Sequence, residues 1–189
     1  MEGITIRKAK GKDRDSILEI FESQDTKWDI PYARQYYDDY FNDAKPDDMV
    51  FVGIVDGNIV AVTGYCPDSD IDDVYWLNWH YTHKDSEGKG IGGKLLEHVI
   101  EMLSPKIRKF YVNTGSRLLN LRALNLYLKK GFRIEAVLRD YYGEGEDQIM
   151  LGMEFWEPDP SLTSISQYTS PMKAVQAYAT GWVKNIEIN

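Results

Sequence analysis

The chain contains one cysteine, Cys66, among its 189 residues, so it cannot form an internal disulfide. It lacks any apolar run approaching the roughly 20 residues that a membrane-spanning helix needs, and its N-terminus does not show a signal-peptide pattern. Positive charge is scarce, because 22 Lys and Arg against 30 Asp and Glu give a net charge of −8, which argues against nucleic-acid binding. With 43% hydrophobic and 28% charged residues, the chain is predicted to be a globular protein of the cytoplasm with no membrane partner.

Glycine is concentrated in one place, where residues 87–96 read EGKGIGGKLL. The preceding residues 74–81 are rich in aromatic and apolar side chains, which predicts a buried strand. Apolar residues at helical spacing follow, namely Ile91, Leu95, Val99 and Met102. A strand, a glycine-rich turn and a helix bring backbone N–H groups and the positive end of the helix dipole to one point. This unit therefore predicts a phosphate-binding turn.

Two phosphate-binding motifs each lack a residue that they need here. Gly88, Gly90 and Gly93 fit the G-x-G-x-x-G pattern of a dinucleotide-binding turn, which requires an acidic residue about twenty positions later. Residues 106–109 read KIRK instead. The P-loop pattern also begins at Gly88, but Leu95 stands where Ser or Thr must hold magnesium. A nucleotide-binding oxidoreductase or phosphotransferase therefore remains the less favoured alternative.

A third pattern fits the same turn. Glu87, Gly90 and Gly92 resemble the Q/R-x-x-G-x-G/A acetyl-CoA loop of the GNAT superfamily of N-acetyltransferases, with Glu in place of the usual Gln or Arg. Residues 120–132, NLRALNLYLKKGF, resemble the N-x-x-A-x-x-L-Y-x-x-x-G-F helix of that family at every fixed position. In this helix Asn120 and Tyr127 fall on one face, and Asn120 is a plausible N-cap.

The resemblance implies an α/β fold of the α+β type. We expect a single domain with a central mixed, mostly antiparallel sheet of about six to seven strands, splayed at a cofactor cleft and flanked by about four helices. The predicted strands are 4–7, 49–55, 59–65, 74–81, 109–113, 132–138 and 148–155. The predicted helices are 13–23, 31–42, 91–103 and 120–130. Residues 139–147 are predicted to form a loop.

The implied activity is transfer of an acetyl group from acetyl-CoA to a primary amine, by direct attack in a ternary complex. In the family, coenzyme A is held by the motif strand, the turn and the second helix. The corresponding residues here are Trp79, Tyr81, Thr82, Gly88, Lys89, Gly90, Ile91, Gly92, Gly93, Asn120 and Tyr127. Tyr127 matches the family's tyrosine near the sulfur, so we expect it to donate a proton to the departing thiolate. Glu87 is expected to turn its carboxylate away from the phosphates.

The general base is less clear from the sequence. Strand alternation places Trp76, Asn78 and His80 on one face, although a bulge would change that parity. His80 is the titratable residue among the three, so it is the candidate base or proton relay. Asp72, Asp73 and a water chain are alternatives. No metal site is predicted.

Aromatic and acidic residues suggest the acceptor. The pair Tyr141-Tyr142 followed by Gly-Glu-Asp resembles the peptide α-amino branch of the family, which includes ribosomal-protein alanine acetyltransferases, although Gln148 replaces the usual Ala. The substrate-binding candidates are Trp28, Tyr32, Asn78, Tyr141 and Tyr142. Acidic residues at 68–73 and 144–147 favour a cationic small amine or a peptide N-terminus, unless they serve solubility alone.

The predicted acetyltransferase domain spans residues 1–156. Residues 157–189 form a C-terminal extension with a helix at about 171–184, which packs on its own domain or joins a second subunit in a homodimer. A further alternative is an acyl-CoA-binding module without transfer activity, suggested by Glu87 and by the open identity of the base.

Overall fold

The computed structural model describes residues 3–25 and 28–155 of the chain. The predicted helix at 171–184 lies outside the described residues. The strands are β1 (Thr5–Lys8), β2 (Met49–Val55), β3 (Asn58–Pro67), β4 (Val74–Thr82), β5 (Lys109–Gly115), β6 (Arg133–Gly143) and β7 (Glu146–Glu154). The helices are α1 (Arg14–Glu22), α2 (Ile30–Phe41), α3 (Ile91–Leu103) and α4 (Leu121–Lys129). Among the described residues, no helix is both long and apolar enough to cross a membrane.

In the described residues the strands form one seven-stranded sheet in the order β1-β2-β3-β4-β5-β7-β6. The β4–β5 pair is parallel, and the other neighbours in the described sheet run antiparallel. The predicted mixed, mostly antiparallel sheet with about four helices is therefore confirmed. The predicted loop at 139–147 is wrong, because β6 continues to Gly143 and pairs there with Glu146. Residues 139–143 of β6 are all exposed, so the sequence carries no apolar alternation that would extend the predicted strand at 132–138.

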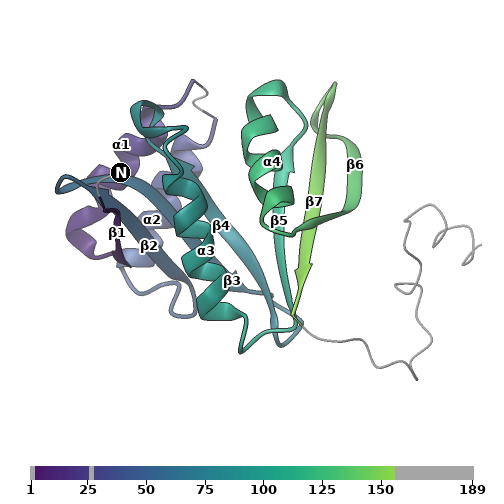
Figure 1. Ribbon diagram of the computed structural model, residues 1–189, viewed down its shortest axis with the longest axis horizontal. Helices are drawn as coiled ribbons and strands as arrows, with labels where there is room; N and C mark the ends of the chain where they lie inside the picture. Colours follow the sequence, from purple (N-terminus) through teal and green to yellow (C-terminus); the bar gives the residue numbers. More distant parts are fainter. Residues whose placement is uncertain (1–2, 26–27, 156–189) are drawn as a thin grey trace, which may run out of the picture. The chain divides into compact units, whose positions relative to one another are not determined.

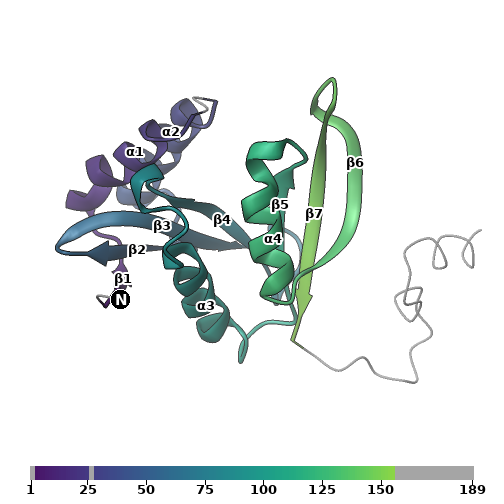
Figure 2. The same cartoon turned by 45° about the horizontal axis from the view of Figure 1, so that its top comes forward.

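The two central strands, β4 and β5, diverge along their length. In the described chain they pair from Val74–Lys109 to Trp76–Tyr111, whereas β4 continues to Thr82 and β5 to Gly115. The rings of Trp76 and Tyr111 stack at the last pair, with centroids 4.8 Å apart. Both views show the strands meeting at one end and separating toward the other (Figures 1 and 2). Helix α3 lies beside β4, and α4 lies beside β5.

Helices cover both faces of the sheet. Helices α1 and α2 pack on one face through a cluster that includes Phe21, Tyr37 and Val52. Helices α3 and α4 pack on the other face through a cluster that includes Leu96 and Phe110. The tyrosines of α2 are therefore mainly core residues, since Tyr36, Tyr37 and Tyr40 are all buried.

A β-bulge interrupts β4 near its middle. Asn78 is paired with Gly64 and Tyr81 with Val62, so Thr63 faces two residues of β4, Trp79 and His80. Trp79 takes a positive φ of 47°, a conformation that costs a non-glycine residue about 1–3 kcal/mol. An extra residue in a strand reverses the side-chain alternation beyond it.

The bulge overturns one sequence-based expectation. Asn78 donates to the Tyr36 hydroxyl (3.3 Å), so it faces helix α2. His80 instead faces Tyr127 of α4, with ring centroids 6.1 Å apart. The prediction that Asn78 and His80 share a face is therefore wrong, because Trp79 occupies the extra position.

Candidate active site

The glycine-rich turn joins β4 to α3. Gly88 and Gly90 have φ values of 73° and 77°, which side chains rarely tolerate, and Gly90 is the N-cap of α3. Among the described residues, no atom would lie within 4 Å of a Cβ placed on either glycine, so space in front of the turn is open. The N–H of Lys94 bonds the Gly90 carbonyl at 3.2 Å. The earlier N–H groups of the helix have no place in its hydrogen-bond ladder and are suited to an anion.

Most cations near the turn already have oxygen partners. Lys89 Nζ donates to the Asp85 carbonyl at 2.7 Å. Lys84 pairs with Asp25, and Lys130 pairs with Glu97. These contacts reduce the positive charge that the turn offers to a phosphate.

Glu87 forms an ion pair across the two halves of the sheet. Its Oε2 lies 2.5 Å from Nη1 of Arg122, which belongs to the first turn of α4. The turn before α3 is thereby linked to the helix beside β5. The structure thus gives this carboxylate a partner, and Arg122 is a residue that the sequence analysis did not select.

Tyr127 is the buried residue of α4. Its side chain is 4% exposed, and burial raises the pKa of its phenol, so the hydroxyl keeps its proton. The ring lies between His80 and Phe132, at centroid distances of 6.1 and 5.8 Å. A protonated phenol in this position is a hydrogen-bond donor, and its ring lies beside His80 of β4.

His80 is packed closely against α3. Its Nδ1 lies 3.0 Å from Thr63 Oγ1, and a Cβ on Gly92 would lie 3.2 Å from Nε2. Burial lowers the pKa of His80 to about 4, so the imidazole is neutral at physiological pH. Thr82 Oγ1 would be 3.1 Å from the same Cβ, so glycine at position 92 lets the helix approach the strand.

Asn120 lies at the N-cap position of α4, as predicted, but within the described residues its side chain makes no capping hydrogen bond. Its amide nitrogen would be 2.5 Å from a Cβ on Gly115, the last residue of β5. The side chain is therefore turned toward the end of β5. Ile91, another predicted cofactor residue, buries its side chain against Ala61 and Leu95, so its backbone N–H is the group left to a ligand.

The face of α1 and α2 carries different side chains. Trp79 and Tyr81 both pack on Phe21, with centroid distances of 5.5 and 4.6 Å. The Tyr81 hydroxyl donates to the Asp29 carboxylate, and the Tyr36 hydroxyl donates to Asp48 at 2.8 Å. Asp29 is a second residue that the sequence analysis did not select, because its partner is 52 positions away.

Four of the predicted substrate residues expose large aromatic surfaces. The exposed fractions are 76% for Trp28, 69% for Tyr32, 60% for Tyr141 and 49% for Tyr142. Tyr141 and Tyr142 form an edge-to-face pair with centroids 5.1 Å apart. The Tyr142 hydroxyl accepts from buried Gln148 at 3.0 Å, which gives that departure from the peptide-branch pattern a structural role.

Several of the predicted rim acids hold loops together. Asp68 accepts from the Trp76 indole at 2.7 Å, Asp73 pairs with Arg108 at 3.1 Å, and Glu146 pairs with Arg117 at 2.7 Å. Within the described residues, no group of three or more His, Cys, Asp or Glu could hold a metal ion.

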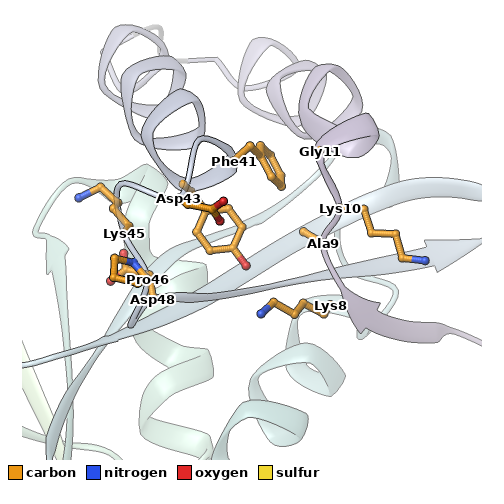
Figure 3. Close-up of a pocket in the computed structure, with 10 residues that line it drawn as sticks. Lys8, Ala9, Lys10, Gly11, Phe41, Asp43, Lys45, Pro46 and Asp48 are labelled. Atoms are coloured by element: carbon orange, nitrogen blue, oxygen red, sulfur yellow. The ribbon is translucent and has the colours of Figure 1, made fainter.

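A hollow of about 250 Å³ lies in another part of the described chain and shares Asp48 with the contacts above (Figure 3). It is lined by residues 8–11 and by the end of α2, with Lys45 and Asp48 at its edge. It contains none of the predicted site residues, so it is not the predicted active site.

The family model described as "Acetyltransferase (GNAT) family" matches residues 15–132. The spermine/spermidine N(1)-acetyltransferase of Bacillus subtilis strain 168 is 28% identical over 153 residues, covering 75% of this chain and 94% of that protein. An uncharacterised N-acetyltransferase of Methanocaldococcus jannaschii is 28% identical over 151 residues, covering 77% and 88%.

Solved structures show the same fold. The ribosomal-protein-S18-alanine N-acetyltransferase of Escherichia coli superposes with a TM-score of 0.66 at 20% identity, covering 86% of this chain and 100% of that chain. An N-acetyltransferase of Staphylococcus aureus Mu50 gives 0.67 at 16% identity, covering 82% and 100%.

The family match extends over more than half of the chain, and the chain belongs to the GNAT family of acetyltransferases. It is an acetyl-CoA-dependent N-acetyltransferase. The family, fold, activity class and cofactor predicted from the sequence are confirmed.

The depressed pKa of His80 generates a prediction about stability. The unfolded histidine has a pKa of about 6.5, so between roughly pH 6.5 and 4 the unfolded chain binds more protons than the folded chain. The free energy of unfolding should therefore fall as the pH falls through this window. In His80→Gln the change from pH 7 to pH 5 should be smaller than in wild type by roughly 1 kcal/mol or more. Urea unfolding at both pH values measures this difference, and equal changes in the two proteins would contradict the lowered pKa of His80 in the folded protein.

Proposed function

We propose that this enzyme acetylates a cationic primary amine, which reaches the thioester of acetyl-CoA from the face of α1 and α2. The observation that carries the proposal is the divergence of β4 from β5. Where the strands separate, one face of the sheet carries the glycine-rich turn and Tyr127. The other face carries the aromatic and acidic groups near Tyr81.

The phosphates of coenzyme A bind the backbone N–H groups of Gly88 to Gly93, where the open space and the helix N-terminus both favour an anion. The pantetheine arm passes between β4 and β5, beside Thr82 and Asn120. Backbone N–H groups at the bulge, from Trp79 to Tyr81, provide donors for the thioester carbonyl as it becomes an oxyanion.

The amine attacks in its neutral form, and the tetrahedral intermediate then expels the thiolate of coenzyme A. Tyr127 donates its phenolic proton or a hydrogen bond to that thiolate, since burial keeps the phenol protonated. The attacking nitrogen gives up one proton as the amide forms, and this proton leaves to solvent through water. His80 serves as a relay on this path rather than as the base, because an imidazole with a pKa of about 4 is a weak acceptor for an ammonium proton.

Two acceptor classes have support. The relatives named for spermine and spermidine favour a polyamine, as do the acidic and aromatic groups on the acceptor face. The second class is a peptide α-amine, favoured by the exposed pair Tyr141 and Tyr142 at the end of β6. A panel of polyamines, lysine-like amines and short peptides, assayed with acetyl-CoA by thiol release, tests the proposal. Thiol release that no amine accelerates would overturn it.

If the phosphates of coenzyme A bind at this turn, Glu87 lowers the affinity of the enzyme for acetyl-CoA. Its carboxylate holds Arg122 and places a negative charge beside the phosphate turn. Glu87→Gln restores the usual family residue and releases the guanidinium. Because exposed ion pairs are worth about 0.2–1 kcal/mol, acetyl-CoA should bind roughly 1.5- to fivefold more tightly at low salt. Calorimetry measures the change, with Glu101→Gln on the exposed side of α3 as a control for net charge. Weaker binding by Glu87→Gln than by that control would show that Glu87 itself supports the cofactor.

Tyr127→Phe tests the proton donor. Phenylalanine keeps the ring that packs on Phe132 but removes the hydroxyl, so the fold and acetyl-CoA affinity should change little. General acid assistance is worth about 10²–10⁴-fold, and kcat should fall within or near that range while KM for the amine stays similar. Steady-state kinetics beside a melting curve decides the point. A folded variant that keeps the wild-type kcat, under conditions where chemistry limits the rate, would show that Tyr127 contributes packing and no proton.

A further inference from the structure

Asp29 occupies the N-cap position of α2, yet within the described residues its carboxylate makes no capping hydrogen bond. Aspartate at an N-cap ordinarily accepts from the N–H groups of the next turn. Here the carboxylate accepts from the Tyr81 hydroxyl of β4 instead. The side chain is thus directed from the start of the helix toward the central strand.

Tyr81 connects this carboxylate to the reaction centre. The β4 bulge places Tyr81 on the same face as Trp79, where its ring packs on Phe21 at 4.6 Å. Burial and the Asp29 carboxylate raise the pKa of Tyr81, so its hydroxyl keeps its proton and donates it in the hydrogen bond to Asp29. Tyr81 therefore holds the Asp29 carboxylate against β4, the strand that carries the proposed oxyanion donors.

Asp29 also lies at the surface. It is half-buried and is flanked in sequence by Trp28, which is 76% exposed, while Tyr32, 69% exposed, follows in the first turn of α2. A carboxylate with exposed aromatic rings in the same short segment is suited to an organic cation, because ring faces also attract ammonium groups.

A carboxylate beside the attacking nitrogen would oppose the reaction, because it stabilises the ammonium form that cannot attack. The same carboxylate suits a positive charge elsewhere on the acceptor. We propose that Asp29, oriented by Tyr81, binds a second ammonium group of the acceptor and gives the enzyme a preference for diamines and polyamines over monoamines. This proposal rests on the proposed function and identifies the residue that selects the substrate.

The test compares two acceptors of equal length, 1,4-diaminobutane and 4-amino-1-butanol, which differ in the second ammonium group. A hydrogen bond to a charged group is worth about 1.5–3 kcal/mol, or roughly 10–100-fold. Wild type should prefer the diamine in kcat/KM by about that factor. Asp29→Asn should remove the preference through KM for the diamine, and leave kcat/KM for the amino alcohol within about twofold.

Matched variants separate this role from a structural one. Asp39→Asn removes the same charge from the same helix, where Asp39 accepts from Gln35 at 2.8 Å, and it should keep the preference. Asp29→Glu should retain most of the preference, and Tyr81→Phe should lose part of it. If Asp29→Asn does not fold, Asp29→Ser takes its place in the test, because serine is also a favoured N-cap residue.

Three results would overturn the proposal: a wild-type enzyme without diamine preference, an unchanged preference in the neutral variants, or an equal loss with both acceptors. Acetyl-CoA affinity, measured by calorimetry, should stay the same in Asp29→Asn. Wild-type protein that binds acetyl-CoA but acetylates neither of these amines nor any other in the panel would instead contradict the proposed function.

Discussion

The loss of pairing between β4 and β5 is the constraint on which the rest of the structure depends. The strands share three paired positions and then separate, although both continue. Buried backbone groups need hydrogen-bond partners, so separated strands favour a ligand that carries amides of its own, as the pantetheine arm does. Helices α3 and α4 flank the divergence and bring the glycine-rich turn and Tyr127 to it.

The bulge at Trp79 determines which side chains lie on each face of β4. Before it, Asn78 faces α2, and after it His80 faces Tyr127 while Tyr81 faces Asp29. One extra residue therefore places a neutral imidazole on the face of α3 and α4, and a phenol bonded to a carboxylate on the face of α1 and α2. A bulge leaves its extra residue outside the regular hydrogen-bond ladder, which is the reason for proposing these peptide N–H groups as oxyanion donors.

Much of this architecture could be predicted from the sequence, because local patterns carry it. The turn and α3 follow from glycine spacing and apolar periodicity, and the Tyr127 helix follows from its resemblance to the family motif. The bulge could not be predicted, since Trp79 looks like any aromatic strand residue and its ring packs on Phe21, which is 58 positions earlier in the chain. The pairs Glu87–Arg122 and Asp29–Tyr81 join residues 35 and 52 positions apart, so no local sequence pattern predicts them.

The most direct test of the central claim is hydrogen–deuterium exchange with and without acetyl-CoA. If the cofactor lies between the diverging strands with its phosphates on the turn, exchange should slow in peptides covering residues 79–93 and 111–127. Peptides from β1 and β2 should change little. Protection confined to residues 8–11 and 41–48, around the hollow in Figure 3, would place the cofactor elsewhere and contradict the account.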